Sequence, residues 1–407
     1  MSTILYSLVS ALLLSNGAFA VGTPFGYAAG TTGGGSASPA VPSSTAQLVS
    51  WLGDSTPRVI LLDKTYDFTD SEGSVTAKAC KPWTCSPNPQ LAIDANEWCE
   101  HYEPNAAMTT VTYKKAGTTA IKVASNKTLL GKGTAGAIKG KGLRIAGGSN
   151  IIIQNIRISD INAQFVWGGD AISIDGGSKI WVRMTKTSIV YPLTAFIIEL
   201  LIRLTITTQF KNVGRQFIVT GYGAAKSITI SDNVFDGAST YSATCNGRHY
   251  WALLFTGASD SITLARNYLY QTSGRGPKLG GTSGYSQSVH IYNNYFVDIS
   301  GHALDAGVGS NALVEGNYFN KVTEPSTSGT QGSVFAPNDA TTAAQCSSHI
   351  GRKCVANTLL SSGTPNRKET GGVSTFKGVS AVTGATVMES SQVGTYVQAH
   401  AGLGKVN

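Results

Sequence analysis

A serine followed by a short apolar run recurs along the chain, and this repeat restricts the possible folds more than any other feature. The serines are Ser125, Ser149, Ser178, Ser227, Ser261, Ser288 and Ser310. Each run is rich in β-favouring residues and predicts a strand. By residue number, successive serines lie 24, 29, 49, 34, 27 and 22 residues apart. A strand roughly every 20 to 30 residues, without a long helical period between, indicates a solenoid of stacked coils.

An asparagine follows the strand in four of these repeats, as Asn233, Asn267, Asn294 and Asn317. If the strands stack in parallel, these residues occupy the same turn of successive coils. Asparagine tolerates left-handed backbone geometry and can hydrogen-bond along such a stack. We therefore predict an all-β fold, a single-stranded right-handed parallel β-helix. An antiparallel sandwich would need hairpin turns, and the sequence contains few.

The step of 49 residues contains the most apolar stretch after the N-terminus, IVYPLTAFIIELLIRLTI at positions 189–206. Removing residues 187–210 would reduce that step to roughly one ordinary coil, so we interpret them as a hydrophobic insertion. Pro192, Glu199 and Arg203 make the stretch a poor membrane span, which needs about 20 predominantly apolar residues. The spacing of its apolar residues is compatible with a helix lying on the solenoid.

The two ends of the chain differ from the repeats. Residues 1–20 hold an apolar run and end in AFA, the pattern of a signal peptide, so we expect a secreted protein that begins near Val21. The ends of a solenoid need to be covered, so residues 21 to about 120 and about 358–407 are expected to act as caps. Residues 21–407 are thus predicted to form one domain.

The chain has six cysteines, and secretion would make disulfides their expected state. None has the paired spacing of a zinc site, and sequence alone leaves the pairing open. Asn126 begins an N-x-S/T sequon and is the predicted glycosylation site. Outside the cell, the net charge of +8 would attract an acidic polysaccharide or an anionic surface; it equally fits a solvated surface without a partner.

Four polar clusters fall on successive predicted coils and could therefore share one face of the solenoid. They are WGGDAISID at 167–175, VGRQF at 213–217, CNGRHYW at 245–251 and SGRGPK at 273–278. Together with VGTPFGYAAGTTGGG at the expected mature start, these motifs resemble those of the fungal pectin lyases, in the pectate and pectin lyase superfamily. The resemblance covers roughly residues 21–360. It implies a β-helix enzyme that cleaves methyl-esterified polygalacturonan by β-elimination.

The resemblance also implies roles for four charged residues. Arg275 matches the family's proton-abstracting arginine, Lys278 and Arg215 match its flanking cations, and Asp170 matches a carboxylate of the same cleft. β-Elimination removes the C5 proton of the sugar, so the site needs a base and positive charge beside the developing enolate. An arginine base requires a lowered pKa, which burial and nearby cations would favour. As surface residues, the same side chains would be ordinary turn or solvated groups.

Aromatic side chains would line such a cleft and stack on neutral, ester-capped sugar faces. The candidates for substrate binding are Trp83, Trp98, Trp167, Tyr250 and Trp251. Core or cap packing is the alternative role for each of them. Trp181 lies inside an apolar strand and is interpreted as a core residue.

The resemblance implies disulfides between Cys80 and Cys99, Cys85 and Cys245, and Cys346 and Cys354. Pectate lyases use calcium to neutralise free carboxylates, whereas an esterified substrate needs little neutralisation. A calcium site wants several acidic oxygens, and few acids lie near Asp170 in the sequence. We therefore predict no metal and no cofactor, with pectin as the partner of a monomer that binds neither nucleic acid nor membrane.

The chain also departs from the family pattern. Family members follow the strand at Trp181 with an Asp-His pair that leads into the GRQ motif, whereas this chain reads Trp181-Val182-Arg183-Met184 and then the insertion. We expect the added residues to lie beside the cleft, so a catalytically impaired, polysaccharide-binding β-helix is the alternative function. A translated intron would explain the insertion. A polygalacturonase-type hydrolase would need paired aspartates, and no convincing pair is present.

Overall fold

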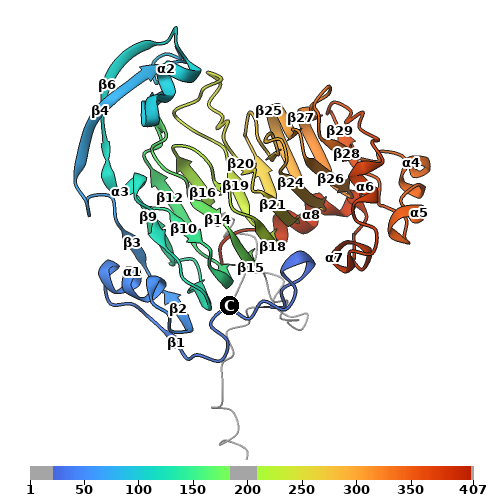
Figure 1. Cartoon of the computed structure of the whole chain (residues 1–407), viewed down its shortest axis with the longest axis horizontal. Coiled ribbons are helices and arrows are strands. Elements are labelled where there is room, and N and C mark those ends of the chain that lie inside the picture. The colour runs from blue at the N-terminus through green and yellow to red at the C-terminus, as the bar shows by residue number, and fades with distance from the viewer. Residues whose placement is uncertain (1–21, 184–208, 405–407) are drawn as a thin grey trace, which may run out of the picture.

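The computed structural model describes residues 22–183 and 209–404, which are built mainly from stacked parallel strands (Figure 1). The strands of the serine repeat lie side by side in one sheet, sheet A, in chain order. Its strands are β1 (Pro39–Ala40), β2 (Arg58–Leu62), β8 (Lys127–Gly131), β11 (Ser149–Gln154), β15 (Gly177–Arg183), β18 (Ala225–Ser231), β21 (Ser259–Ala265), β24 (Ser286–Tyr292), β26 (Ser310–Glu315) and β28 (Ser333–Phe335). Ser149 pairs in parallel with Ser178, and Ser261 with Ser288. The predicted parallel β-helix is confirmed.

Most coils carry strands in two further sheets, which the serine repeat did not reveal. Sheet B contains β3 (Thr65–Asp67), β9 (Ala137–Lys139), β12 (Arg157–Ile161), β16 (Gln209–Val213), β19 (Val234–Asp236), β22 (Tyr268–Tyr270), β25 (Tyr295–Ala306), β27 (Tyr318–Ser326) and β29 (Thr358–Leu360). Sheet C contains β7 (Ile121–Lys122), β10 (Leu143–Ala146), β14 (Ile172–Asp175), β17 (Ile218–Thr220), β20 (Leu253–Phe255), β23 (Lys278–Leu279) and the end of β25. Many of these strands have only two to four residues, too few to show a periodic pattern.

Inward-facing side chains fill the solenoid with columns of like residues. Ile151, Ile180, Ile228 and Ile262 follow one another in register along sheet A and are inaccessible to solvent. Each such residue contributes about 1.5–3 kcal/mol by its burial. The repeat is therefore a packing repeat, because the same apolar position recurs in every coil.

The turn between sheets A and B carries a ladder of buried asparagines. The side-chain amides of Asn233, Asn267, Asn294 and Asn317 each donate to the side-chain oxygen of the next asparagine, at 2.9, 2.9, 3.0 and 3.1 Å, and Asn357 ends the series. The predicted hydrogen bonds along the stack are thus present. The expected left-handed geometry, however, lies one residue earlier.

The left-handed residues of this turn are those that precede the ladder asparagines. Asp232, Arg266, Asn293 and Gly316 have φ angles of 58°, 58°, 53° and 61°. The turn needs one residue with positive φ to reverse the chain and one amide that points into the stack. Different residues meet these two needs, and the prediction assigned both to the asparagine.

Residues 184–208, which hold most of the predicted insertion at 187–210, lie outside the described residues. They join β15 to β16, so their flanks lie at the turn between sheets A and B, where six other coils have two residues. Phe210 belongs to β16, where it is buried and its ring stacks on Phe235 at 5.1 Å. The predicted boundary was therefore two residues too late. Among the described helices, none has the length and apolar character that crossing a bilayer requires.

The N-terminal end of the core is closed by helix α1 (Thr45–Gly53), which buries Leu48 and Leu52. Ser44 caps this helix by accepting a hydrogen bond from the amide of Gln47. The coils begin earlier than the predicted end of the cap near residue 120, because β2 and β3 already belong to sheets A and B. The register pairs Arg58 of β2 with Lys127, so Thr56 stands where Ser125 stands in the next coil, and the serine repeat did not mark this strand.

A side sheet stands beside the N-terminal coils (Figure 1). It consists of β4 (Ser74–Lys81), β5 (Leu91–Ile93), β6 (Ala107–Lys114) and β13 (Phe165–Val166). The remaining helices are η1 (Gly26–Ala28), η2 (Ala95–Glu97), α2 (Trp98–Tyr102), α3 (Lys115–Thr118), α4 (Ala340–Ala344), α5 (Ser347–Ile350), α6 (Gly371–Ser374), α7 (Ser380–Thr383) and α8 (Ser390–His400).

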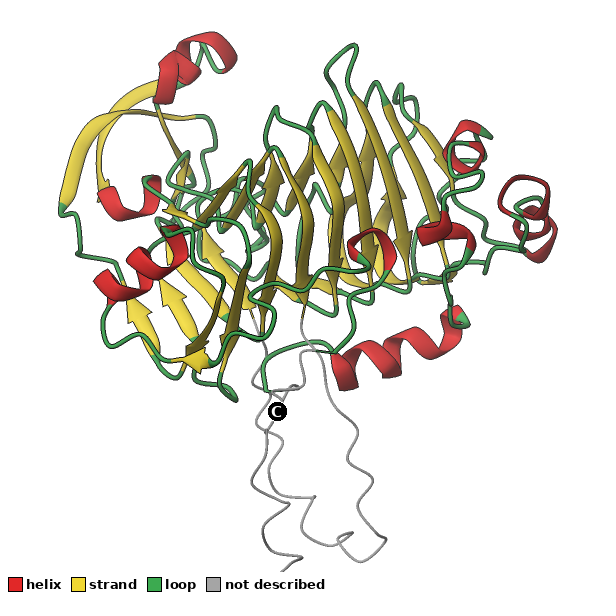
Figure 2. Ribbon diagram, turned by 60° about the horizontal axis from the view of Figure 1, so that its bottom comes forward, coloured by secondary structure: helices red, strands yellow, loops and turns green. Residues whose placement is uncertain are grey.

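The C-terminal segment covers the side of the solenoid as well as its end. Its first residues form β29 of sheet B, and α8 then runs along the outside of that sheet (Figure 2). Val393 and Val397 of α8 belong to one apolar cluster with Val234 and Tyr295. Beyond α8, the Gly404 amide donates to the side-chain oxygen of Asn155. The predicted capping tail at 358–407 is therefore partly a strap along sheet B.

The outer face of sheet A is covered by the N-terminal segment. Trp181 is fully buried there beneath Phe25, with the two rings edge to face at 6.4 Å. Trp181 is thus buried as expected, but outside the solenoid interior. The predicted glycosylation site lies near this segment, where the Asn126 side chain accepts a hydrogen bond from Asn150; glycosylation stays a prediction.

Candidate functional site

The four predicted charged residues lie on one edge of the stack, where the chain passes from sheet B to sheet C. Asp170 precedes β14, Arg215 lies between β16 and β17, and Arg275 and Lys278 stand before and at the start of β23. In sheet C the order of strands is β14, β17, β20 and β23. The four residues therefore belong to neighbouring coils of one face.

Asp170 and Arg215 form an ion pair across adjacent coils. A guanidinium nitrogen of Arg215 lies 3.5 Å from the Asp170 carboxylate, which also accepts a hydrogen bond from the Gln216 amide at 2.8 Å. Burial raises the pKa of Asp170, while Arg215 and the Gln216 amide oppose this rise. Arg215 also lies over the ring of Trp167 at 3.9 Å. These contacts orient the Arg215 guanidinium.

Arg275 is held chiefly by its backbone. Its φ angle is 50°, and its amide donates to Nε2 of His302 at 3.3 Å. Its guanidinium lies 5.7 Å from the centre of the Tyr250 ring, and its buried Nε has no hydrogen-bond partner among the described residues. Burial lowers the pKa of Arg275 and the charge of Arg215 lowers it further, whereas Tyr250 and Asp305 act in the opposite direction.

Lys278 forms an ion pair at 2.7 Å with Asp305, a residue that the sequence analysis missed. His302 was missed as well. Arg275 and His302 are 27 residues apart, as are Lys278 and Asp305. This is the step between Ser261 and Ser288, so adding one coil to each predicted residue would have found its neighbour.

The five predicted aromatic residues come together in one cluster beside the charged groups. Trp83 contacts Trp251 with ring centres 5.1 Å apart, Trp98 contacts Trp167 at 6.3 Å, and Tyr250 contacts Trp251 at 5.4 Å. Trp251 is only 6% exposed and packs among the other rings of the cluster. The other four are partly exposed, as residues that contact a sugar chain must be.

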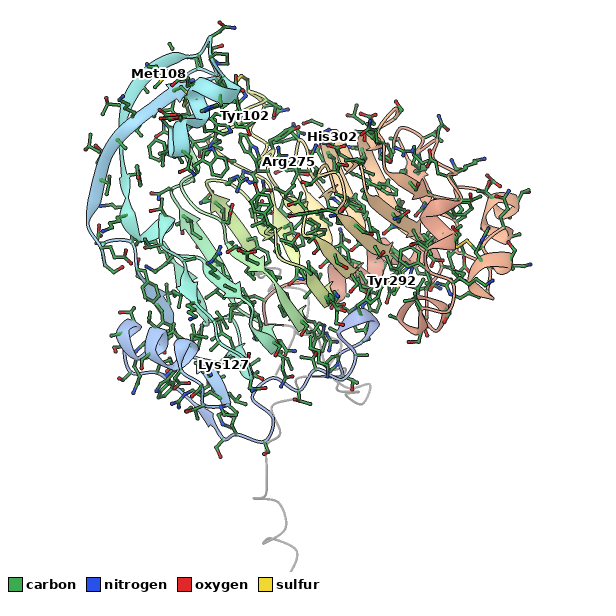
Figure 3. The ribbon with its side chains drawn as sticks, in the orientation of Figure 1. Tyr102, Met108, Lys127, Arg275, Tyr292 and His302 are labelled. Carbon is green, nitrogen blue, oxygen red and sulfur yellow. A yellow bond between two sulfur atoms is a disulfide. The ribbon has the colours of Figure 1, made fainter. Side chains whose placement is uncertain are left out.

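Tyr102 was not proposed for the site, although it stacks on Trp98 at 6.0 Å and is 72% exposed. In the view of Figure 3, Tyr102, Arg275 and His302 are labelled on the upper side of the molecule, and Lys127 on the lower side. Its position in the sequence, one helical turn after Trp98, was the available signal.

The disulfides join Cys80 to Cys99, Cys85 to Cys245, and Cys346 to Cys354, as the resemblance implied. The first lies within the aromatic cluster. The second ties the loop that precedes Tyr250 to the segment after β4. These two cross-links restrict the motion of the segments that carry the aromatic side chains.

His249 lies beneath the surface of the site and contacts the backbone of two of its residues. It is buried, and its Nε2–H donates to the backbone oxygens of Arg215 and Trp251 at 2.7 and 2.9 Å. Both partners are acceptors, so this nitrogen carries the proton. Burial lowers the pKa of His249 to about 4, although the two carbonyl oxygens act in the opposite direction. The ring therefore links the coils of Arg215 and Trp251 as a neutral group.

A hollow of about 220 Å³ opens beside the Asp170–Arg215 pair. Its lining includes Arg144, Trp167 and the segment around Gly117. It can hold a small polar group such as part of a sugar unit. No three His, Cys, Asp or Glu side chains in residues 22–183 and 209–404 are grouped as metal ligands.

A family model described as pectate lyase matches residues 1–406. The chain is 47% identical over 408 residues to the probable pectin lyase F-2 of Aspergillus terreus, covering 98% of this chain and 78% of the relative. It is 42% identical over 403 residues to pectin lyase B of Emericella nidulans, covering 98% of both chains.

Among solved structures, the fold is similar to that of a pectate lyase from Bacillus sp. N165 in complex with trigalacturonate. The TM-score is 0.59 at 19% identity, over 94% of this chain and 100% of that one. Pectate lyase II from Xanthomonas campestris pv. campestris has a TM-score of 0.52 at 21% identity, over 94% and 98% of the two chains. At these identities the likeness establishes the fold. The chain belongs to the pectate lyase family, in which the fungal pectin lyases are its relatives at 42–47% identity.

Proposed function

We propose that this polysaccharide lyase cleaves methyl-esterified polygalacturonan by β-elimination at the edge between sheets B and C. The observation that carries the proposal is the gathering of Arg215, Arg275 and Lys278 with Asp170 on neighbouring coils. Relatives named pectin lyase, similar over nearly the whole chain, support the same reaction.

In the proposed reaction, Arg275 in its neutral form takes the C5 proton. The C5 electron pair forms the C4=C5 bond, the bond from C4 to the glycosidic oxygen breaks, and that oxygen takes a proton from solvent water. Arg215 and Lys278 stabilise the enolate that develops on the ester carbonyl. Asp170 positions Arg215 through their ion pair. Burial and the nearby Arg215 favour the neutral form of Arg275, because both disfavour a further positive charge.

The proposed reaction uses no metal. A calcium site needs several free oxygen ligands, but the Asp170 carboxylate is engaged by Arg215 and the Gln216 amide. The donor set at this edge therefore does not fit the ion, and an esterified substrate has little charge to neutralise.

We further propose that the protein acts outside the cell as a monomer. The leader-like residues 1–20 support secretion, although they lie outside the described residues. Three disulfides are also expected in an oxidising compartment.

The test uses the secreted full chain with two substrates, highly methylated pectin and unesterified polygalacturonate, and follows the ultraviolet absorbance of the unsaturated product. We expect product formation from pectin to continue in the presence of a chelator, and little product from polygalacturonate. A requirement for calcium with polygalacturonate would instead indicate pectate lyase activity. Binding of pectin without any product would contradict the proposal.

A further inference from the structure

Sheet C presents a continuous row of outward side chains along the candidate cleft. Backbone register places these residues opposite one another in successive strands: Lys122, Arg144, Ser173, Val219, Leu254 and Lys278. Their chain neighbours Leu143, Ile172 and Leu253 point into the core. The row is therefore a floor that runs parallel to the solenoid axis.

This floor changes character along its length. Val219 and Leu254, in the middle, are apolar and only 8% and 9% exposed. Lys278 at one end is paired with Asp305. Four strand spacings separate Lys278 from Arg144, which is about 19 Å at about 4.8 Å each. Arg144 thus lies four strands from Lys278, although it lines the same hollow as Asp170 and Arg215.

Arg144 is oriented at this second position. Its side chain is 49% exposed, lines the hollow that contains Asp170 and Arg215, and pairs with Asp175 at 2.7 Å. Asp175 is itself held by the Gly223 amide at 2.9 Å. Lys122 follows in the row, is exposed, and has no ion pair among the described residues. The charges of Arg144 and Asp175 balance, so Lys122 gives this end of the row a net positive charge.

We propose that Arg144 and Lys122 form a subsite for a galacturonosyl unit whose carboxyl group is free, several units away from the unit that loses its proton. This inference rests on the proposed function. A carboxylate can pair with Arg144 and Lys122, whereas a methyl ester carries no charge to attract them. The favoured substrate is thus pectin that is esterified at the reacting unit and free at one distant unit.

The test uses methylated galacturonate oligomers that carry one free carboxylate at each position in turn, with the fully methylated oligomer as reference. For the intact chain, kcat/KM should be highest when the free carboxylate lies several units from the cleaved bond, at the one or two adjacent positions that reach Arg144 and Lys122. Arg144→Gln should reduce that preference about two- to fivefold, the range of an exposed ion pair. Lys122→Gln should reduce it less, and Arg144→Lys should retain most of it.

Asp175→Asn should change the preference for the free carboxylate in the opposite direction. Removing this acid leaves Arg144 unpaired, so the preference for the free carboxylate should increase. Lys226→Gln, which changes an exposed cation of sheet A, is the matched control and should leave the preference unchanged. Raising the ionic strength should weaken the preference in the intact chain.

The outcomes separate the two proposals. If the intact chain yields unsaturated product but shows no positional preference, or if Arg144→Gln and Lys226→Gln behave alike, the subsite is wrong and the lyase function stands. If no oligomer and no pectin yields unsaturated product, the function itself is wrong.

Discussion

The two edges of sheet B have different roles. One carries buried turns that hold the coils together, and the other carries the side chains of the candidate site. At the edge shared with sheet A, six coils turn within two residues, and four of them place an asparagine into the buried ladder. At the edge shared with sheet C, the connections differ in length and carry the charged and aromatic side chains. In these six coils the first edge is uniform because each turn must match the next, while the second edge varies because only the sheets beneath it must match.

This contrast also places the insertion. Its flanks, Arg183 and Gln209, lie at the asparagine edge, and the five residues of β16 separate that edge from the turn that holds Arg215. The insertion therefore joins the chain away from the cleft edge, whereas the expected position of the added residues beside the cleft concerns residues outside the described ones and stays a prediction. In the sequence the GRQ motif follows the insertion closely, but an extended strand carries it to the other edge of the sheet.

The largest effect is expected at the edge between sheets B and C. Arg275→Ala should lower kcat about 10²- to 10⁴-fold, the usual contribution of a general base, and leave the free energy of unfolding nearly unchanged. Product absorbance and denaturant unfolding measure the two quantities. The Arg58→Ala exchange, at the N-terminal end of sheet A, is the control and should retain activity. A kcat within tenfold of that of the intact chain would exclude Arg275 as the base.

The reverse pattern is expected at the edge between sheets A and B. Asn267→Ala removes an amide that donates to the Ile230 oxygen and accepts from Asn233. Unsatisfied buried groups cost about 1–3 kcal/mol each, so the free energy of unfolding should fall by about 3 kcal/mol or more. The activity of the folded fraction should be kept. Asn320→Ala, a partly exposed residue of sheet B, should cost less than about 1 kcal/mol, and equal losses would contradict a special role for the ladder.

The stability of the protein should also depend on pH through His249, a buried residue at the edge between sheets B and C. His249 has a folded-state pKa of about 4 against an ordinary value of 6.5. The unfolded chain therefore binds the proton first, and the free energy of unfolding falls as the pH drops from about 6.5 to about 4. The loss attributable to this residue should be on the order of 3 kcal/mol.

His249→Gln should remove that part of the pH dependence. The measurement compares unfolding free energies of the two chains at several pH values. Parallel curves between pH 6.5 and 4 would show that His249 does not titrate as described.

The smallest effect is expected from deleting residues 186–208. Distant, independent sites usually couple by less than about 0.5 kcal/mol, so kcat/KM on pectin should change by about twofold or less. Activity of the shortened and full chains on the same pectin preparation gives the comparison. A gain of tenfold or more would mean that the segment impairs the cleft after all.

The sequence by itself determined the repeat, and with it the fold, the ladder and the set of groups that share one edge. A solenoid reuses one position per coil, so residues separated by one step become neighbours, as Lys278 and Asp305 show. The disulfide between Cys85 and Cys245, which are far apart in the sequence, could be predicted only from the resemblance, because the spacing of cysteines does not reveal their pairing.

Only the tertiary structure decided which charged groups pair, which polar groups share hydrogen bonds and which residues cover one another. The ion pair of Arg215 with Asp170, the bond from the Arg275 amide to His302 and the burial of Trp181 beneath Phe25 depend on side-chain direction and on segments that return from elsewhere in the chain. A one-dimensional pattern records which coil a residue occupies, but not which way its side chain points or what covers it. The free energies of pairing and burial depend on both.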